Sequence, residues 1–143
     1  TSNLGSNYIL EGINGQGEIT EEAKNSVNNL LKHQFRPEFL NRLDEIVFYK
    51  PLKKSEISSI LDLLINDLNK RLSDKQLTVS VTERAKNYIV DAGYDPVYGA
   101  RPLKRFVQSS VETLIARLMI SEDIEPNTTL EVDYDGRQLI INH

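Results

Sequence analysis

The chain has 143 residues, no cysteine and a formal net charge of −4 at pH 7. This length suits one domain, or one small domain with part of another. Without cysteine there are no disulfides or thiolate metal sites, and the acidic balance argues against nucleic acid as the main partner. No apolar run is long enough to cross a bilayer and no signal peptide is recognisable, so we expect a cytoplasmic protein without a membrane partner. Because the chain opens on Thr1 rather than Met, we expect it to be a piece of a longer protein.

Residues 1–50 are expected to form a short, partly helical segment. Residues 1–19 are polar and rich in Gly, Asn and Ser, which is typical of a loop. Thr20, followed by two glutamates, predicts the start of a helix that continues through about His33. Two further elements are predicted: a short helix with Pro37 in its first position and Phe39, Leu40 and Leu43 facing inward, and a strand over Glu45–Tyr49.

Residues 51–143 are expected to form an α+β domain in which helices pack on a small sheet. Ser55 is predicted to cap a helix whose apolar residues recur at helical spacing through Leu72. Asp135-Gly136 is a strong signal for a two-residue hairpin turn. The other predicted elements are a strand over 77–81, a helix from Thr82 to Gly93, a long helix after Pro102 with Leu103, Val107, Val111, Leu114 and Leu118 on one face, and strands over 129–134 and 138–141.

The most informative stretch is Gly93–Arg105, with the sequence GYDPVYGARPLKR. Pro102 suits the first position of a helix, because a proline lacks the N–H that would have no partner there. Arg101, Lys104 and Arg105 then lie in or near the first turn, where cations oppose the positive end of the helix dipole. Acids are the usual residues at a helix start, and an anion held by an arginine and by free backbone N–H groups would explain why cations stand there instead. The alternatives are a solvated basic face and a patch that pairs with acids elsewhere in the fold.

Arg42 and Asn3 are further candidates for contact with phosphate. A planar guanidinium can stabilise charge on transferring phosphoryl oxygens, and the Asn3 amide, in a strand-like opening, could orient a water or a phosphate oxygen. The structural alternative for Arg42 is an i,i+4 ion pair with Glu38 near a helix C-terminus. For Asn3 the alternative is an asparagine at a strand end without any function.

Other kinds of site are not indicated. His33 and His143 lie far apart without companion ligands at metal spacing, so no metal site is predicted. There is no Gly-x-x-x-x-Gly-Lys-Ser/Thr loop and no apolar strand that ends in paired acids. We therefore expect that this chain does not hydrolyse ATP by itself. A nucleic-acid surface at Arg101, Lys104 and Arg105 is disfavoured because no aromatic residues interleave with them.

Three stretches together resemble the second ATPase ring of the Clp chaperones of the AAA+ class. They are Thr1–Ser6, Phe35–Glu45 and Gly93–Arg105, and they occur in that order. The resemblance implies that residues 1–50 are the C-terminal part of an AAA+ large domain and that residues 51–143 are its small domain. It also implies roles for single residues: Asn3 as sensor 1, Arg42 as the arginine finger that acts in trans, Arg101 as the sensor-2 arginine, and Gly99, Ala100 and Lys104 beside the nucleotide.

Within that family the resemblance is to the ClpB-type disaggregase branch. It implies ATP and Mg²⁺ in the parent protein, with no cofactor tightly bound to this chain. It also implies a homo-hexamer that acts on unfolded or aggregated proteins, with a co-chaperone as a candidate partner. Protease-linked relatives carry a tripeptide with an aliphatic residue before glycine, and no glycine between Ser6 and Phe35 follows one. The alternatives are a regulatory subunit of a Clp protease and a module that only packs subunits together.

Overall fold

The computed structural model describes residues 1–95 and 97–143, and its internal contacts divide the chain into two units, Thr1–Pro51 and Leu52–His143. Pro96, which belongs to the Gly93–Arg105 motif, lies outside the described residues.

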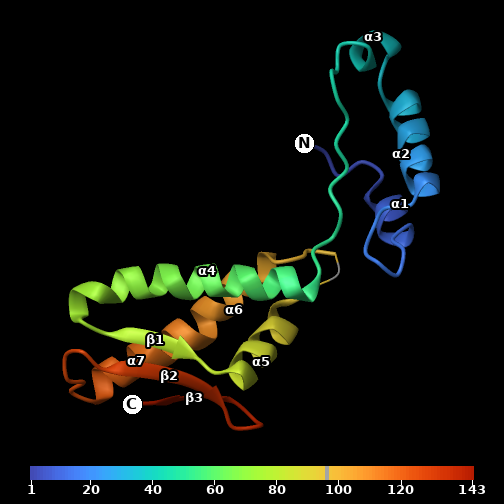
Figure 1. Ribbon diagram of the computed structural model, residues 1–143. Coiled ribbons are helices and arrows are strands. Elements are labelled where there is room, and N and C mark those ends of the chain that lie inside the picture. The colour runs from blue at the N-terminus through green and yellow to red at the C-terminus, as the bar shows by residue number, and fades with distance from the viewer. Residues whose placement is uncertain (96) are drawn as a thin grey trace. The chain divides into compact units, whose positions relative to one another are not determined.

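The first unit is mainly helical. It contains α1 (Ser6–Glu11), α2 (Glu21–Gln34) and α3 (Pro37–Leu40), which are labelled in Figure 1. The predicted cap of α2 is confirmed, because Thr20 Oγ1 accepts a hydrogen bond from the Ala23 N–H at 3.3 Å. Pro37 is the first residue of α3, also as predicted. The buried apolar residues of this unit are Ala23 and Val27, so its own core is small.

Three predictions for the first unit are wrong. Residues 1–19 are not all loop, because their apolar patch lies in α1, which packs against α2. No strand forms at Glu45–Tyr49, nor around Asn3, because neither segment joins a sheet in the part of the chain that the structure describes. Phe39 and Leu43 do not face inward but are 50% and 42% exposed. The β-branched and aromatic residues of Glu45–Tyr49 would fit the surface of a sheet, but such residues form a strand only where a neighbouring strand pairs with them.

The second unit contains a mixed three-stranded sheet and the longer helices. Strand β2 lies between β1, to which it is parallel, and β3, to which it is antiparallel. The predicted α+β class, with helices on a short sheet and a C-terminal hairpin, is confirmed. The elements are α4 (Lys54–Leu72), a 3-10 turn η1 (Ser73–Lys75), β1 (Thr78–Val81), α5 (Glu83–Gly93), α6 (Arg101–Val107), a π-helical segment η2 (Gln108–Glu112), α7 (Thr113–Ser121), β2 (Thr129–Tyr134) and β3 (Leu139–Asn142).

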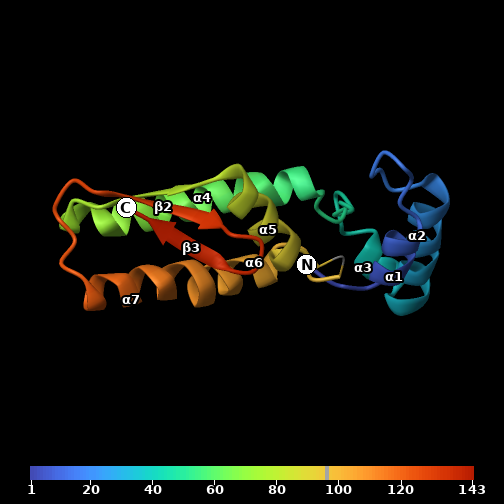
Figure 2. The same ribbon diagram turned by 90° about the horizontal axis from the view of Figure 1, so that it is seen from below.

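The core of this unit lies between the sheet and its helices. Val79, Leu130 and Val132 point from the strands into it and are fully or almost fully buried. Helix α4 and the continuous helix α6–η2–α7 run along this face, and Figure 2 shows the sheet from its other side. From Thr129 to Val132, exposed and buried residues alternate along β2, because neighbouring side chains of a strand project to opposite faces; Asp133 is buried as well.

Helix α4 also protects the free edge of β1. Asn69 Oδ1 accepts the Val79 N–H at 2.6 Å, and Asn69 Nδ2 donates to the Val79 carbonyl at 3.0 Å. The side-chain amide thus takes the place that a neighbouring strand would occupy, which blocks edge pairing at this residue. The helix begins at Lys54 rather than after a Ser55 cap, because Glu56 Oε2 accepts the Lys53 N–H at 2.7 Å.

The turn between β2 and β3 is longer than predicted. Tyr134 pairs with Leu139, so four residues connect the strands instead of two. Asp135 Oδ1 accepts the N–H groups of Arg137 and Gln138 at 2.8 and 2.9 Å, which closes the turn. These hydrogen bonds, that from Gln138 first, lower the pKa of Asp135 below its ordinary value.

The helix that follows Arg101 is interrupted by the π-helical segment η2. Its fully buried residues are Leu103, Val107, Val111 and Ile115, each four positions after the last, whereas the predicted Leu114 and Leu118 are only partly buried. On a regular α-helix each residue is rotated by about 100° around the helix axis, so the Ile115 side chain would project about 120° away from the direction of Leu103. The wider π turn absorbs the excess residue and keeps all four side chains on the core face.

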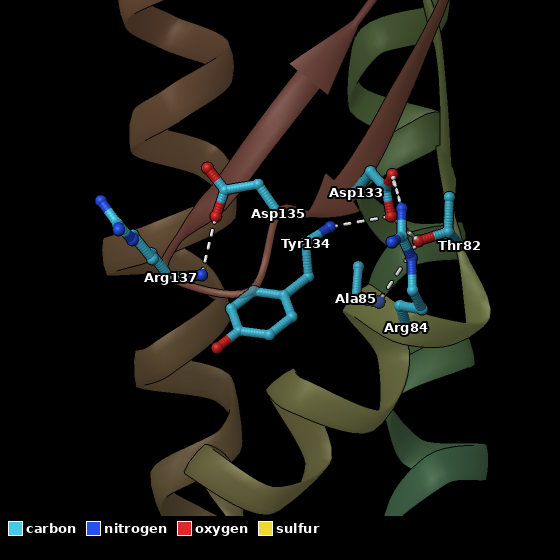
Figure 3. A network of polar contacts seen from close by, with 7 residues as sticks. All are labelled: Thr82, Arg84, Ala85, Asp133, Tyr134, Asp135 and Arg137. Carbon is cyan, nitrogen blue, oxygen red and sulfur yellow. Dashed lines mark hydrogen bonds and ion pairs between the residues drawn. The ribbon is translucent and has the colours of Figure 1, made fainter.

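A buried acid fastens the end of β2 to the start of α5 (Figure 3). Thr82 Oγ1 donates to Asp133 Oδ1 at 2.6 Å and accepts the Ala85 N–H at 3.2 Å, so the hydroxyl that caps α5 also binds the strand. Arg84 donates to Asp133 Oδ2 at 2.6 Å, and the Tyr134 N–H donates to Oδ1 at 2.8 Å. The Thr82 and Tyr134 hydrogen bonds, with Arg84 as a further cause, hold the pKa of Asp133 below its ordinary value.

We expect Asp133→Asn to make folding less sensitive to acid. Because the pKa of Asp133 is lower in the folded chain than in the unfolded chain, where it is about 3.9, the ionised carboxylate stabilises the fold above that pH. This stabilisation is lost as the pH falls through the folded-state value. Urea unfolding followed by circular dichroism at pH 6 and pH 3 should show a smaller acid-induced loss for Asp133→Asn than for the wild type. Equal losses in the two proteins would contradict this role.

We also expect deletion of Ser110 from η2 to leave the fold intact. Removing one residue shortens the interval between the first and last core residues so that they differ by only about 20° on a regular α-helix. Stability should fall by less than about 2 kcal/mol in urea unfolding. Deletion of Asp67 from the regular helix α4 is the matched control, because it rotates Leu68 off the core and should cost about 2–5 kcal/mol. Similar costs for the two deletions would refute the explanation of η2.

Candidate functional site

The site is built on the turn between α5 and α6. Helix α5 ends at Gly93 as predicted, but the reason is a close approach rather than a left-handed cap. A Cβ on Gly93 would lie 2.6 Å from Leu103 Cδ1 and 2.9 Å from Leu103 Cα. Only glycine therefore allows α6 to pack this near to α5 with Leu103 fully buried. Gly99, with φ of +63°, supplies the left-handed residue that turns the chain back toward α6.

Helix α6 begins one residue earlier than predicted. Arg101 is its first residue and Pro102 its second, and Ala100 stands in the cap position, where it packs against the core. No acid lies in the first turn of α6. The backbone N–H of Arg101 donates a hydrogen bond to the Tyr98 carbonyl at 3.3 Å, and this contact ties the start of the helix to the preceding turn.

The cations of α6 lie on two different faces. Arg101 and Arg105, four residues apart, line a depression of about 440 Å³ together with Ala92, Tyr98, Pro102, Phe106 and Ser109. Lys104 lines a second depression, of about 490 Å³, between α4 and α6. The structure thus places Arg105 in the same depression as Arg101, whereas Lys104, which the resemblance puts beside the nucleotide, lines the other depression. The i,i+4 spacing of the two arginines was the sequence signal that could have indicated this.

The two arginines of the first depression have no acidic partner within residues 1–95 and 97–143. Other cations of this unit do: Arg71 contacts Glu112 at 2.6 Å, and Lys54 contacts Asp91 at 2.7 Å. The carboxylate of Glu112 raises the pKa of Arg71 above its ordinary value. Ion pairs between these two arginines and acids of the fold, one of the alternatives above, are therefore not found in the described residues. A bound anion would reduce the repulsion between Arg101 and Arg105, which lie on one face of the helix.

In the first unit, Arg42 and Asn3 are both exposed. Helix α3 ends at Leu40, so Arg42 lies in the turn that follows it, where its N–H donates to the Phe39 carbonyl at 3.1 Å. No Glu38–Arg42 ion pair is present among the described residues, so the structural alternative for Arg42 is not found. The Asn3 carbonyl accepts the Ser6 N–H at 3.1 Å at the start of α1, and its side-chain amide makes no hydrogen bond in the described part of the chain.

The described residues also lack two other kinds of feature. They contain no group of three His, Asp or Glu side chains that could hold a metal ion. None of their helices has the length and apolar character required to span a membrane.

Comparisons with known proteins agree with the fold and the motifs. Residues 52–132 match the family model for the C-terminal, D2-small domain of ClpB protein. The chain is 46% identical over 142 residues to the chaperone protein ClpB of Bacillus cereus (strain ATCC 10987 / NRS 248) and 48% identical over 141 residues to that of Clostridium tetani. Each alignment covers 99% of this chain and 16% of the relative, so the chain spans about a sixth of the length of these proteins.

Solved structures of Hsp104 have the same fold. The S. cerevisiae Hsp104–ADP complex superposes with a TM-score of 0.84 at 29% identity, and covers 99% of this chain and 24% of its own. A closed-state reconstruction of Hsp104 with ATPγS and FITC-casein gives a TM-score of 0.82 at 28% identity.

The small α+β domain and its arginine-bearing helix are therefore those of a Clp-type AAA+ chaperone. The chain belongs to the ClpB family. The alternative of a protease regulatory subunit is not favoured, because the family model and the relatives named above are all of ClpB.

Proposed function

We propose that this chain is the nucleotide-sensing part of the second ATPase module of a ClpB-type disaggregase. The observation that carries the proposal is the pair of arginines, Arg101 and Arg105, that line one depression without an acidic partner in the described residues. Guanidinium groups in this arrangement suit the phosphates of a nucleotide, because the planar fork donates two parallel hydrogen bonds. Gly99 and Ala100 would shape the backbone beside the nucleotide, and Lys104 would act from the neighbouring face.

ATP with Mg²⁺ is the proposed ligand in the parent protein. Structures of the related Hsp104 contain ADP or ATPγS, which supports a nucleotide for this chain as well. Residues elsewhere in the parent protein would supply the phosphate-binding loop and the Mg²⁺ ligand. Arg101 would contact the phosphates from the small domain, so that ATP binding draws this domain toward the large one by a hinge motion.

Arg42 and Asn3 would act on the large-domain side of such a site. Arg42 is exposed in a turn and makes no ion pair in the described residues, so its guanidinium is available to the nucleotide of a neighbouring subunit. There it would stabilise the charge that develops on the transferring phosphoryl group. The Asn3 amide would orient the attacking water or a phosphate oxygen. Both roles require a ring of subunits, and a homo-hexamer is the proposed assembly.

The proposed substrates are unfolded or aggregated proteins. One of the related Hsp104 structures contains casein, which supports a protein substrate. Six large apolar side chains of the first unit are exposed and would be covered by further parts of the parent protein or by a neighbouring subunit: Tyr8, Phe39, Leu43, Ile46, Val47 and Tyr49. A co-chaperone would act with the ring, and nucleic acid has no proposed role.

We expect Arg42→Ala to abolish ATP hydrolysis in a full-length ClpB-type protein that contains this segment. With the first-ring site disabled, the turnover rate should fall by about 10³-fold or more while ATP binding persists, as for other arginine fingers. Because the residue acts in trans, mixing these subunits with subunits that cannot bind ATP should restore part of the activity. Lys32→Ala, which removes an exposed cation of α2, is the control. Hydrolysis that survives Arg42→Ala would remove this assignment.

We expect Arg101→Ala to weaken ATP binding at the same site by about tenfold or more, which corresponds to one charge-assisted contact of about 1.5–3 kcal/mol. The hexamer measured by analytical ultracentrifugation should persist in excess nucleotide. Arg137→Ala, at an exposed cation of the β2–β3 turn, should bind ATP normally. If Arg101→Ala changed only the size of the assembly, the chain would be a subunit-packing module and the sensing role would be wrong.

A further inference from the structure

We propose that Asp95 is a positioning residue that fixes the turn from which Arg101 reaches the nucleotide. This inference rests on the proposed function, because Asp95 can position Arg101 for a ligand only if Arg101 binds one. Asp95 itself lines neither depression described above and would not touch the nucleotide.

Asp95 closes the turn before α6 with four hydrogen bonds. Its Oδ1 accepts the backbone N–H groups of Val97 and Tyr98 at 2.7 and 2.8 Å. Its backbone carbonyl accepts the Gly99 N–H at 2.7 Å, and its own N–H donates to the Gly99 carbonyl at 3.3 Å. Asp95 therefore closes the turn twice, through its backbone hydrogen bonds to Gly99 and through its carboxylate, which binds the N–H groups inside the turn.

These hydrogen bonds lead directly to Arg101. Tyr98, whose N–H is held by the Asp95 carboxylate, accepts the Arg101 N–H on its carbonyl oxygen at 3.3 Å. The Arg101 side chain has no acidic partner among the described residues, so no ion pair sets its direction. The backbone of the turn decides where Arg101 projects, and Asp95 holds that backbone. A displacement of about 1 Å at such a contact can cost up to about 100-fold in function.

The role depends on the reach of the Asp95 oxygen and not on its charge. Asparagine places an amide oxygen at the same position and can accept the same two N–H groups. Glutamate keeps the charge but carries its oxygens one bond further from the backbone. Asp95→Asn and Asp95→Glu therefore separate the two explanations.

The chain offers a matched control in Asp135. Its Oδ1 also accepts two backbone N–H groups in a turn of the same unit, but that turn leads into β3 and not into α6. Asp135→Ala thus removes the same kind of interaction, and any general loss of stability it causes is comparable to that of Asp95→Ala.

The experiment measures binding of a fluorescent ADP analogue and of ATP to full-length ClpB-type protein that contains this segment, with the first-ring site disabled. We expect Asp95→Ala and Asp95→Glu to weaken binding by several-fold up to about 100-fold. Asp95→Asn and Asp135→Ala should stay within about twofold of the wild type. The double variant Asp95→Ala/Arg101→Ala should bind no more weakly than Arg101→Ala alone, because Asp95 acts through Arg101.

The outcomes distinguish the two proposals. If Arg101→Ala weakens binding while Asp95→Ala and Asp95→Glu do not, the positioning role of Asp95 is wrong and the proposed function stands. If Asp95→Asn weakens binding and Asp95→Glu does not, the charge is what matters and the inference is overturned. If Arg101→Ala itself binds like the wild type, the proposed function fails. Should Asp95→Ala not fold, the comparison of Asp95→Asn with Asp95→Glu still decides the question.

Discussion

The second unit depends on the close packing of Gly93 against Leu103. There is no room for a Cβ at Gly93, and Leu103 is completely buried in the core. This contact brings the end of α5 and the start of α6 together, so the chain between them must form a compact turn. Gly99 and Asp95 make that turn possible, one through a left-handed backbone and the other through its carboxylate. The packing of Leu103 fixes α6 against α5, and the turn held by Asp95 fixes the backbone at Arg101, the first residue of that helix.

Helix geometry then divides the basic residues of α6 by face. Residues four apart project on the same side, which brings Arg101 and Arg105 into one depression, whereas Lys104 projects toward α4. Two like charges on one face raise the energy of the fold slightly, and they are not offset by an acid in the described residues. Arg71 and Arg84 show the usual alternative, since each contacts a carboxylate. An arrangement that is unfavourable for folding alone is typical of a binding site.

The two units differ in how completely they bury their apolar residues. In the second unit the apolar residues of five helical segments, α4, α5, α6, η2 and α7, and of three strands share one core. The first unit buries only Ala23 and Val27, and its segment from Phe39 to Tyr49 exposes most of its large apolar side chains. That segment has the β-branched composition of a strand, but no neighbouring strand pairs with it among the described residues. The same chain therefore contains one unit that buries its apolar residues in a shared core and a segment that leaves most of its large apolar side chains exposed.

The sequence by itself indicated most of the helices but not α1, a hairpin at the C-terminus, the α+β class and the family, because periodicity, capping residues and the Gly93–Arg105 motif are local signals. It also indicated Arg101 and Arg42 as candidate functional residues. Only the tertiary structure decided that β1 and β2 are parallel, that Glu45–Tyr49 is not a strand, and that η2 widens the helix after Arg101. It also decided that Arg101 and Arg105 line one depression and that Lys104 lines another. The strand pairing and the walls of the two depressions depend on which surfaces meet across long sequence distances, and the composition of one segment does not record those contacts.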